Sequence, residues 1–322
     1  MKKSTLFPIL LMGVSLSFFS CSDDDPDNNA QGWTFDLLPN DTGTKPTEAQ
    51  MSATVTQYVD HVVLPTYKDL LDKMTAYTAA VDKFVASNSQ NDLSDACTAW
   101  RAARVPWEQS EAFLFGVADK GLYDPSLDSW PLDKNGIDKI IESGDFSNVD
   151  GDVDDDEDAP ADAPQNLRGF HTAERMLFDN GDPRQISKSP FSDNEKKYLQ
   201  IVSKHMLKDV TALYNGWDKG LGDINVPTSY GEAMKKHDGT SAYTGLSSIY
   251  QAIETILNGN NGMAGISNEV GTAKIQDPVD KWNESNKDAS DPNNPGVLAV
   301  ESWYSWHSRD DYTNNIWSIR NS

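Results

Sequence analysis

The sequence predicts an all-α protein. Several long segments place apolar residues three or four positions apart, which is the spacing of a helix face that packs on a core. Two segments open with a capping-box motif, Thr47 to Gln50 and Ser192 to Glu195, in which side chains satisfy free backbone N–H groups. No segment shows a convincing alternation of apolar and polar residues, as a half-buried strand would require.

The first twenty residues predict a secretory signal peptide. Two lysines precede an apolar run from Leu6 to Phe19, which is too short for a lasting membrane anchor. Ser20-Cys21 then resembles the cleavage site of bacterial lipoproteins, where Cys21 would carry the lipid. The aspartates that follow resemble the acidic tag of surface lipoproteins in the Bacteroidetes. We therefore expect a secreted lipoprotein of the outer membrane, exposed at the cell surface.

The net charge of the chain restricts the kinds of partner that it can bind. The formal net charge is −23, and removal of residues 1–20, which hold two lysines and no acid, changes it to −25. Such a chain repels nucleic acid and anionic membrane surfaces and attracts cations. Cys97 would be the only cysteine left after Cys21, so no intramolecular disulfide is expected, and its small apolar neighbours predict a buried thiol.

The helical domain is predicted to span residues 47–322. Residues 21–46 are polar and rich in Asp, Asn, Pro and Gly, as in a flexible tether. The first bundle, about 47–144, begins with an antiparallel pair of helices between Thr47 and Phe115. Pro65 predicts a kink in the first of them.

The second helix, roughly Leu93 to Phe115, places two carboxylates among tryptophans. Glu108 and Glu111 are three positions apart and so share a helix face. Asp128 follows in a proline-bearing loop and adds a third carboxylate. A solvated salt bridge with Arg104, one turn before Glu108, is the usual role of such charges. The neighbouring tryptophans favour a buried site instead, because large aromatic side chains normally face a core.

A histidine and a carboxylate lie on another helix face farther along the chain. Pro164 breaks the chain there and Asn166 is the predicted N-cap. His171 and Glu174 are three positions apart, close to the Glu-x-x-His spacing of helical di-iron proteins. Gly169 would let a neighbouring backbone or a ligand approach the first turn. The same spacing also fits a surface hydrogen bond, so the metal interpretation depends on the other carboxylates.

An acidic insert at residues 145–165 is predicted to be disordered. Asp150, Asp152 and Asp154 begin a calcium-loop spacing, but the required glycine and the closing glutamate are missing, so only weak calcium binding is expected. Residues 166–322 would form the His-x-x-Glu helix and the second bundle. Its later helices are predicted at Ser192–Trp217, around residues 246–257, and from Glu301 to Ser322.

These motifs, taken in order, resemble the imelysin-like family. The resemblance implies an all-helical fold of two bundle halves, with a functional cleft between or beside them. Relatives continue through at least one more helix, so the C-terminal half is expected to be short by part of its bundle. The motifs that carry the resemblance are W-x3-R-x2-W-E-x2-E-x-F-x-F-G at 100–116, L-D-S-W-P at 127–131, G-x-H-x2-E at 169–174, and the segments at 268–278 and 301–305.

The resemblance also implies a metal site, on the residues that match the family's putative ligands. Four carboxylates and one imidazole suit iron, zinc, manganese or calcium. We expect an envelope lipoprotein that binds iron for uptake or sensing, in contact with iron-uptake proteins of the envelope. The implied ligands are Glu108, Glu111, Asp128, His171 and Glu174.

Three alternatives remain open from the sequence. A zinc metallopeptidase would need an open coordination position and a separate base, and the chain has no HExxH motif. A carbohydrate-binding surface protein would use exposed tryptophans such as Trp130 or Trp303. Finally, Arg101 and Arg104 could neutralise the acids and leave a salt-bridged cluster without a metal.

Overall fold

The computed structural model describes residues 45–151, 163–239, 242–259, 261–291 and 293–322. The predicted signal peptide, Cys21 and nearly all of the tether lie outside these residues. Within the described part, no helix combines the length and the apolarity needed to cross a bilayer.

The regular secondary structure of the described chain is almost entirely helical, as predicted. Its α-helices are α1 Glu48–Tyr58, α2 Leu64–Ser87, α3 Gln90–Glu108, α4 Val117–Gly121, α5 Tyr123–Asp128, α6 Lys134–Ser143, α7 Gly169–Leu177, α8 Asp193–Asp218, α9 Tyr230–Lys236, α10 Ile249–Asn258, α11 Met263–Glu269, α12 Asp277–Glu284, α13 Pro295–Leu298 and α14 Ser308–Asn321. Tighter or wider helical turns are η1 Val59–Val63, η2 Glu111–Phe113, η3 Pro164–Leu167 and η4 Val270–Gln276.

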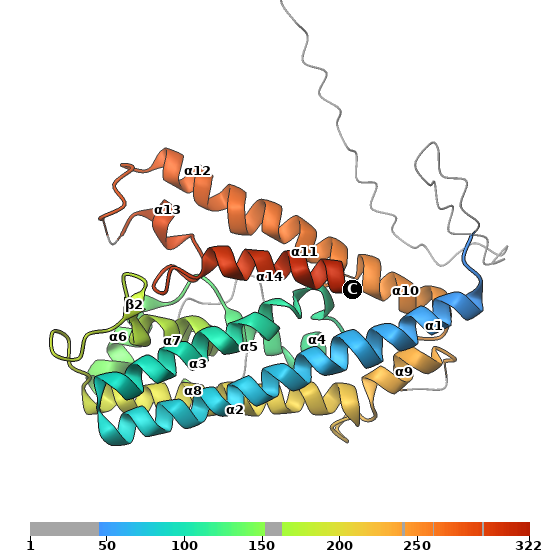
Figure 1. Ribbon diagram of the computed structural model, residues 1–322, viewed down its shortest axis with the longest axis horizontal. Coiled ribbons are helices and arrows are strands. Elements are labelled where there is room, and N and C mark those ends of the chain that lie inside the picture. Colours follow the sequence, from blue (N-terminus) through green and yellow to red (C-terminus); the bar gives the residue numbers. More distant parts are fainter. Residues whose placement is uncertain (1–44, 152–162, 240–241, 260, 292) are drawn as a thin grey trace, which may run out of the picture. The chain divides into compact units, whose positions relative to one another are not determined.

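The predicted antiparallel pair is present as α2 and α3, which pack along each other (Figure 1). Both predicted capping boxes form, with Thr47 bonded to the backbone of Gln50 and Ser192 to that of Glu195. The irregularity expected at Pro65 is a π-helical turn, η1, directly before α2. The capping boxes therefore fixed the starts of α1 and α8 correctly, but the second predicted helix, roughly Leu93 to Phe115, is wrong at its end because α3 stops at Glu108 and a 3-10 turn, η2, follows.

The two sequence halves interlock. Helices α7 and α8, from the predicted second bundle, pack with α2 and α3 of the first. The C-terminal helix α14 returns to α3 and also contacts α11 (Figure 1). Trp100 and Trp107 of α3 and Trp217 of α8 are fully buried in the shared core. The acidic insert that divides the sequence therefore does not separate the helices before it from those after it in space.

Two flanks of the acidic insert are folded, contrary to the expected disorder of residues 145–165. Val149 is fully buried, and the Arg168 guanidinium donates to the carbonyl oxygens of Val149 at 2.8 Å and of Gly151 at 2.9 Å. Residues 152–162, with Asp152 and Asp154, lie outside the described part. The anchor for these flanks is the buried side chain of Arg168, just beyond the insert, and composition does not reveal that it folds back onto Val149 and Gly151.

One small β-hairpin was not predicted. Strands β1 Phe178–Asp179 and β2 Asp182–Pro183 pair antiparallel across Asn180 and Gly181, which both have positive φ. Asn-Gly is the preferred sequence of such a two-residue turn. Strands of two residues are too short to show an alternating pattern.

Candidate functional site

The His-x-x-Glu pair lies on α7 and is completely buried. His171 and Glu174 both have no exposed surface, and His171 Nδ1 lies 3.0 Å from Glu174 Oε2. The other oxygen of Glu174 accepts from the Ser305 backbone N–H at 2.8 Å and from its hydroxyl at 2.7 Å. Both oxygens of Glu174 are therefore engaged, and the carboxylate fixes the orientation of the imidazole ring.

The start of α7 differs from the prediction. The helix begins at Gly169, after the extended residue Arg168, and Asn166 belongs to the preceding turn η3 instead of serving as N-cap. Gly169 has φ +87°, and a Cβ atom there would lie 2.3 Å from the carbonyl oxygen of Leu127. The predicted close backbone approach is thus present, and it brings the end of α5 against α7.

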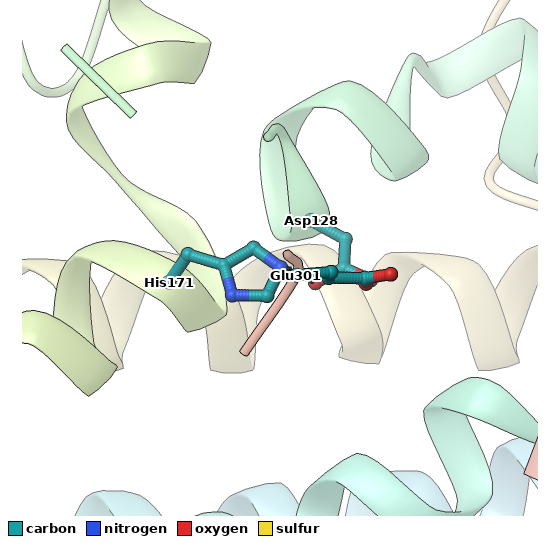
Figure 2. Close-up of side chains that lie close together, drawn as sticks. All are labelled: Asp128, His171 and Glu301. Carbon is teal, nitrogen blue, oxygen red and sulfur yellow. Dashed lines mark ion pairs between the residues drawn. The ribbon is translucent and has the colours of Figure 1, made fainter. Parts of the chain in front are cut away.

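This approach places Asp128 beside His171. Asp128 ends the short helix α5, where a loop was expected. Its Oδ1 lies 3.1 Å from His171 Nε2, and Glu301 Oε1 lies 3.5 Å from the same nitrogen. Figure 2 shows the imidazole ring directed at the two carboxylates. These three side chains each offer a ligand atom, all within 4.8 Å of one another.

His171 Nε2 has no hydrogen-bond partner among the described residues, although it is buried. If Nδ1 donates its proton to Glu174, the lone pair of Nε2 points toward two carboxylates. That arrangement is repulsive unless a proton or another cation lies there. Despite burial, Asp128 raises the pKa of His171 well above its ordinary value, so a proton on Nε2 relieves the repulsion in the absence of metal. A metal cation that replaces this proton would accept the Nε2 lone pair and both carboxylate oxygens.

Arg104, on α3, is the permanent counter-charge of the cluster. Its guanidinium is fully buried and pairs with Glu108 and Asp128, with Glu301 at 3.0 Å, and with Asp311 at 3.2 Å. Neighbouring side chains complete these contacts, because Asn315 donates to Glu108 at 2.5 Å and Ser302 to Asp311 at 2.5 Å. Arg104 therefore neutralises part of the acidic cluster, as the salt-bridge alternative predicts. Arg101 instead donates to the carbonyl oxygens of Gly181 and Ser305.

The pKa values divide the carboxylates into two sets. Burial raises the pKa of Glu108 and of Glu111 well above the ordinary value, despite Arg104 near the first and Lys274 near the second. Burial also acts on Asp128, but Arg104 and His171 outweigh it and lower its pKa to about 2. Lys274, His171 and Arg104 together hold the pKa of Glu301 well below its usual range against burial. The two carboxylates nearest His171 are therefore the ones kept ionised.

The ionised carboxylates of Asp128 and Glu301 line a cavity in the surface. This cavity, of about 660 Å³, is lined by Asp128, Glu301, Lys274 and Trp130, and also by Glu111 and Asp124. A second cavity of about 330 Å³ shares Glu111, Asp124 and Glu269 with the first. A small ligand can therefore approach Asp128 and Glu301 from solvent.

The structure brings the five predicted ligands together, but not in equivalent roles. Asp128 and His171 face each other, Glu174 orients the histidine, and Glu108 is paired with Arg104. Glu111 groups with Glu108 and Asp128 within 4.8 Å but faces the cavities. Glu111 does not share a helix face with Glu108 because α3 ends at Glu108. The Ser110 hydroxyl donates to the Trp107 carbonyl oxygen there, and the tighter turn η2 begins at Glu111.

Glu301, Lys274 and Asp311 were not predicted as site residues. The segment from Glu301 was expected to be helical, but α14 begins only at Ser308, and residues 301–306 form turns with Ser302 and Trp306 at positive φ. Glu301 and Lys274 did stand in two of the motifs that carried the family resemblance. Their place in these motifs was the sequence feature that could have indicated Glu301 and Lys274, because neither residue lies near the predicted ligands in sequence.

The fold and the site define a class: an all-α protein with a buried histidine–carboxylate cluster at the foot of an acidic cavity. The model of the imelysin family, peptidase M75, matches residues 63–322. The chain belongs to the imelysin family.

The chain is similar to solved and curated proteins. The crystal structure of a protein from Parabacteroides distasonis, described as an iron-regulated protein A precursor, is 70% identical, with a TM-score of 0.85 over 88% of this chain and 76% of that one. Iron-regulated protein A of Synechococcus elongatus is 27% identical over 167 residues, which cover 52% of this chain and 40% of that relative. An imelysin peptidase from Bacteroides ovatus is 49% identical over 40% of this chain and 36% of its own, with a TM-score of 0.38.

Proposed function

We propose that this protein binds a divalent metal cation, with iron as the physiological metal, between His171, Asp128 and Glu301. The observation that carries the proposal is the buried Nε2 atom of His171, which lacks a hydrogen bond and is directed at two ionised carboxylates. One nitrogen and two oxygens form a donor set that suits Fe²⁺, Mn²⁺ or Zn²⁺. The names of the iron-regulated relatives support iron among these.

Glu174 would act as a positioning residue in this site. It accepts from His171 Nδ1 and is itself held by Ser305. A carboxylate behind a metal-bound histidine fixes the tautomer and raises the basicity of the ligand nitrogen. Glu108 and Asp311 would not contact the metal, because Arg104 pairs with both of them.

The cellular setting we propose is the envelope, where the protein would serve iron uptake or sensing. The support is the signal-like segment at residues 1–20 and Cys21 in the sequence. Labelling of the cell with a radioactive fatty acid should mark the parent chain but not Cys21→Ala.

Proteolysis is the competing function, because the family is named as a peptidase family. A metallopeptidase requires a carboxylate free to accept a proton from the metal-bound water. Glu174 is not available for this, since both of its oxygens are hydrogen-bonded. Glu111, which lines both cavities, is the carboxylate that could serve as this base instead. The binding function needs only the three donor atoms at His171, whereas proteolysis needs such a base in addition.

The test measures metal content and metal affinity together. Protein purified without chelator should contain metal by elemental analysis, and titration of the metal-free protein with Mn²⁺ should give one site. His171→Ala should weaken this binding at least tenfold. His205→Ala is the matched control, because His205 contacts Asp150 and Asp209 away from the cluster, and it should leave the affinity unchanged. Equal binding by parent and His171→Ala would sink the proposed site, and metal-dependent casein cleavage lost in His171→Ala would favour the peptidase.

A further inference from the structure

Lys274 places a buried ammonium group at the floor of the larger cavity. The residue is 9% exposed, and its Nζ lies 2.7 Å from Glu301 Oε2 and 3.4 Å from Glu269 Oε1. Lysine is seldom buried to this extent unless its charge is paired. The position of the ammonium is therefore set by the acids around it.

A wide helical turn creates this position. Lys274 lies in the π-helical segment η4, between α11 and α12. In an α-helix, side chains five positions apart point in different directions, but a π-helical turn brings them closer to one face. Glu269 and Lys274 are five positions apart and form an ion pair. The turn thus directs the lysine to the cavity floor together with one of its partners.

Glu301 connects Lys274 to the proposed metal position. One of its oxygens accepts from Lys274, and the other lies 3.5 Å from His171 Nε2 and 3.0 Å from Arg104. Any cation bound at His171 is consequently one carboxylate away from the ammonium. Like charges at such a separation repel each other strongly in a site that is partly shielded from water.

The cavity floor also holds a carboxylate with no partner of its own. Glu111 is 5% exposed, lines both cavities, and makes no hydrogen bond or ion pair with any residue that the structure describes. The ammonium of Lys274 is the positive charge that most lowers the pKa of Glu111, against its burial. Acids outnumber bases at the floor, so a cation is favoured there whether it is Lys274 or a metal ion.

We propose that Lys274 is a built-in counter-ion that competes with the bound divalent cation and so lowers its affinity. This inference rests on the metal site proposed above. Without metal, the ammonium neutralises Glu301 and lessens the repulsion among the carboxylates. When the cation binds, Glu301 is shared between the metal and Lys274, and the repulsion between the two cations favours release. Lys274 thereby keeps binding reversible, as a protein that passes its metal onward requires.

The experiment compares Mn²⁺ affinities by calorimetric titration of the full chain. Lys274→Met should bind Mn²⁺ at least about tenfold more tightly than the parent, which corresponds to about 1.4 kcal/mol. Lys281→Met is the matched control, because Lys281 lines the same cavity but is half exposed and pairs with Asp277. Its affinity should stay within about twofold of the parent, as expected for a screened surface charge.

The outcomes separate this inference from the proposed function. If the parent binds Mn²⁺ through His171 and Lys274→Met binds equally or more weakly, Lys274 does not compete and only this inference fails. If the parent does not bind but Lys274→Met does, competition is supported. If neither binds, the inference fails together with the proposed metal site.

A second uncharged variant, Lys274→Gln, tests the inference if Lys274→Met does not fold. Lys274→Gln removes the charge but keeps a donor for Glu301, so it separates the effect of charge from that of the hydrogen bond. It should also tighten Mn²⁺ binding, whereas Lys274→Arg, which keeps the charge, should not. Tightening in Lys274→Arg equal to that in Lys274→Gln would overturn the charge argument.

Discussion

The two ends of the charge cluster differ in how their carboxylates are neutralised. At the sealed end, formed by Arg104, Glu108 and Asp311, a fixed guanidinium and neighbouring side chains satisfy the acids, and all three residues have no exposed surface. At the open end, formed by Glu111, Asp124, Glu269 and Lys274, the acids line cavities, and Lys274 is the permanent cation among these four. Carboxylates with permanent ion-pair partners are expected where a cluster supports the fold. An excess of acids over bases is expected where a cluster binds and releases a cation.

The largest expected effect comes from breaking the sealed end. Arg104→Met should lower the free energy of unfolding by about 3–5 kcal/mol, because it leaves several buried carboxylates without their counter-charge. Urea unfolding in the presence of EDTA measures this loss. Arg309→Met, at an exposed position, should change stability by less than about 0.5 kcal/mol. A loss below about 1 kcal/mol in Arg104→Met would show that the sealed end is not structural.

A smaller effect is expected at the contact that joins α5 to α7. Gly169→Ala should cost about 3 kcal/mol, because Gly169 has a positive φ and an added Cβ atom would collide with the Leu127 carbonyl oxygen. Gly222→Ala isolates the backbone strain, since Gly222 also has a positive φ but no atom within 4 Å of the added carbon. It should cost about 1 kcal/mol. Equal losses in the two variants, by thermal or urea unfolding, would argue against the close contact.

The smallest effect should appear at the open end as a dependence on pH. Burial and the charge of Asp128 raise the pKa of Asp124 to about 7 from its ordinary 3.8. The folded protein then holds a proton that the unfolded chain has lost, so this group costs stability as the pH rises from about 4 to about 7. Asp124→Asn does not titrate and should become more stable than the parent across that range, by on the order of 1 kcal/mol at pH 7 given the solvent in the cavity. Urea unfolding at several pH values with EDTA measures the difference. A difference that is constant or shrinks toward pH 7 would contradict the assignment.

Much of the scaffold could be predicted from the sequence because its causes are local. The capping boxes at Thr47 and Ser192 and the pairing of α2 with α3 depend on neighbouring residues and on helical periodicity. Gly169 could be recognised as a place of close approach, because a residue without a side chain leaves room at the first turn for a neighbouring backbone. The grouping of His171 with Asp128 required the family motifs as well, because the two residues are 43 positions apart in the sequence.

The sequence by itself determined the helices, the acidic balance and most of the polar residues that meet in the core. Only the tertiary structure decided their roles. Glu111 leaves the face of Glu108 because α3 ends there, and Glu301 enters the site because its segment is a turn and not a helix. The division between paired and unpaired carboxylates depends on Arg104, Lys274 and Glu301, whose contacts span up to 207 residues of sequence. Electrostatic energies follow distance and burial in space, and neither is encoded in the local pattern of residues.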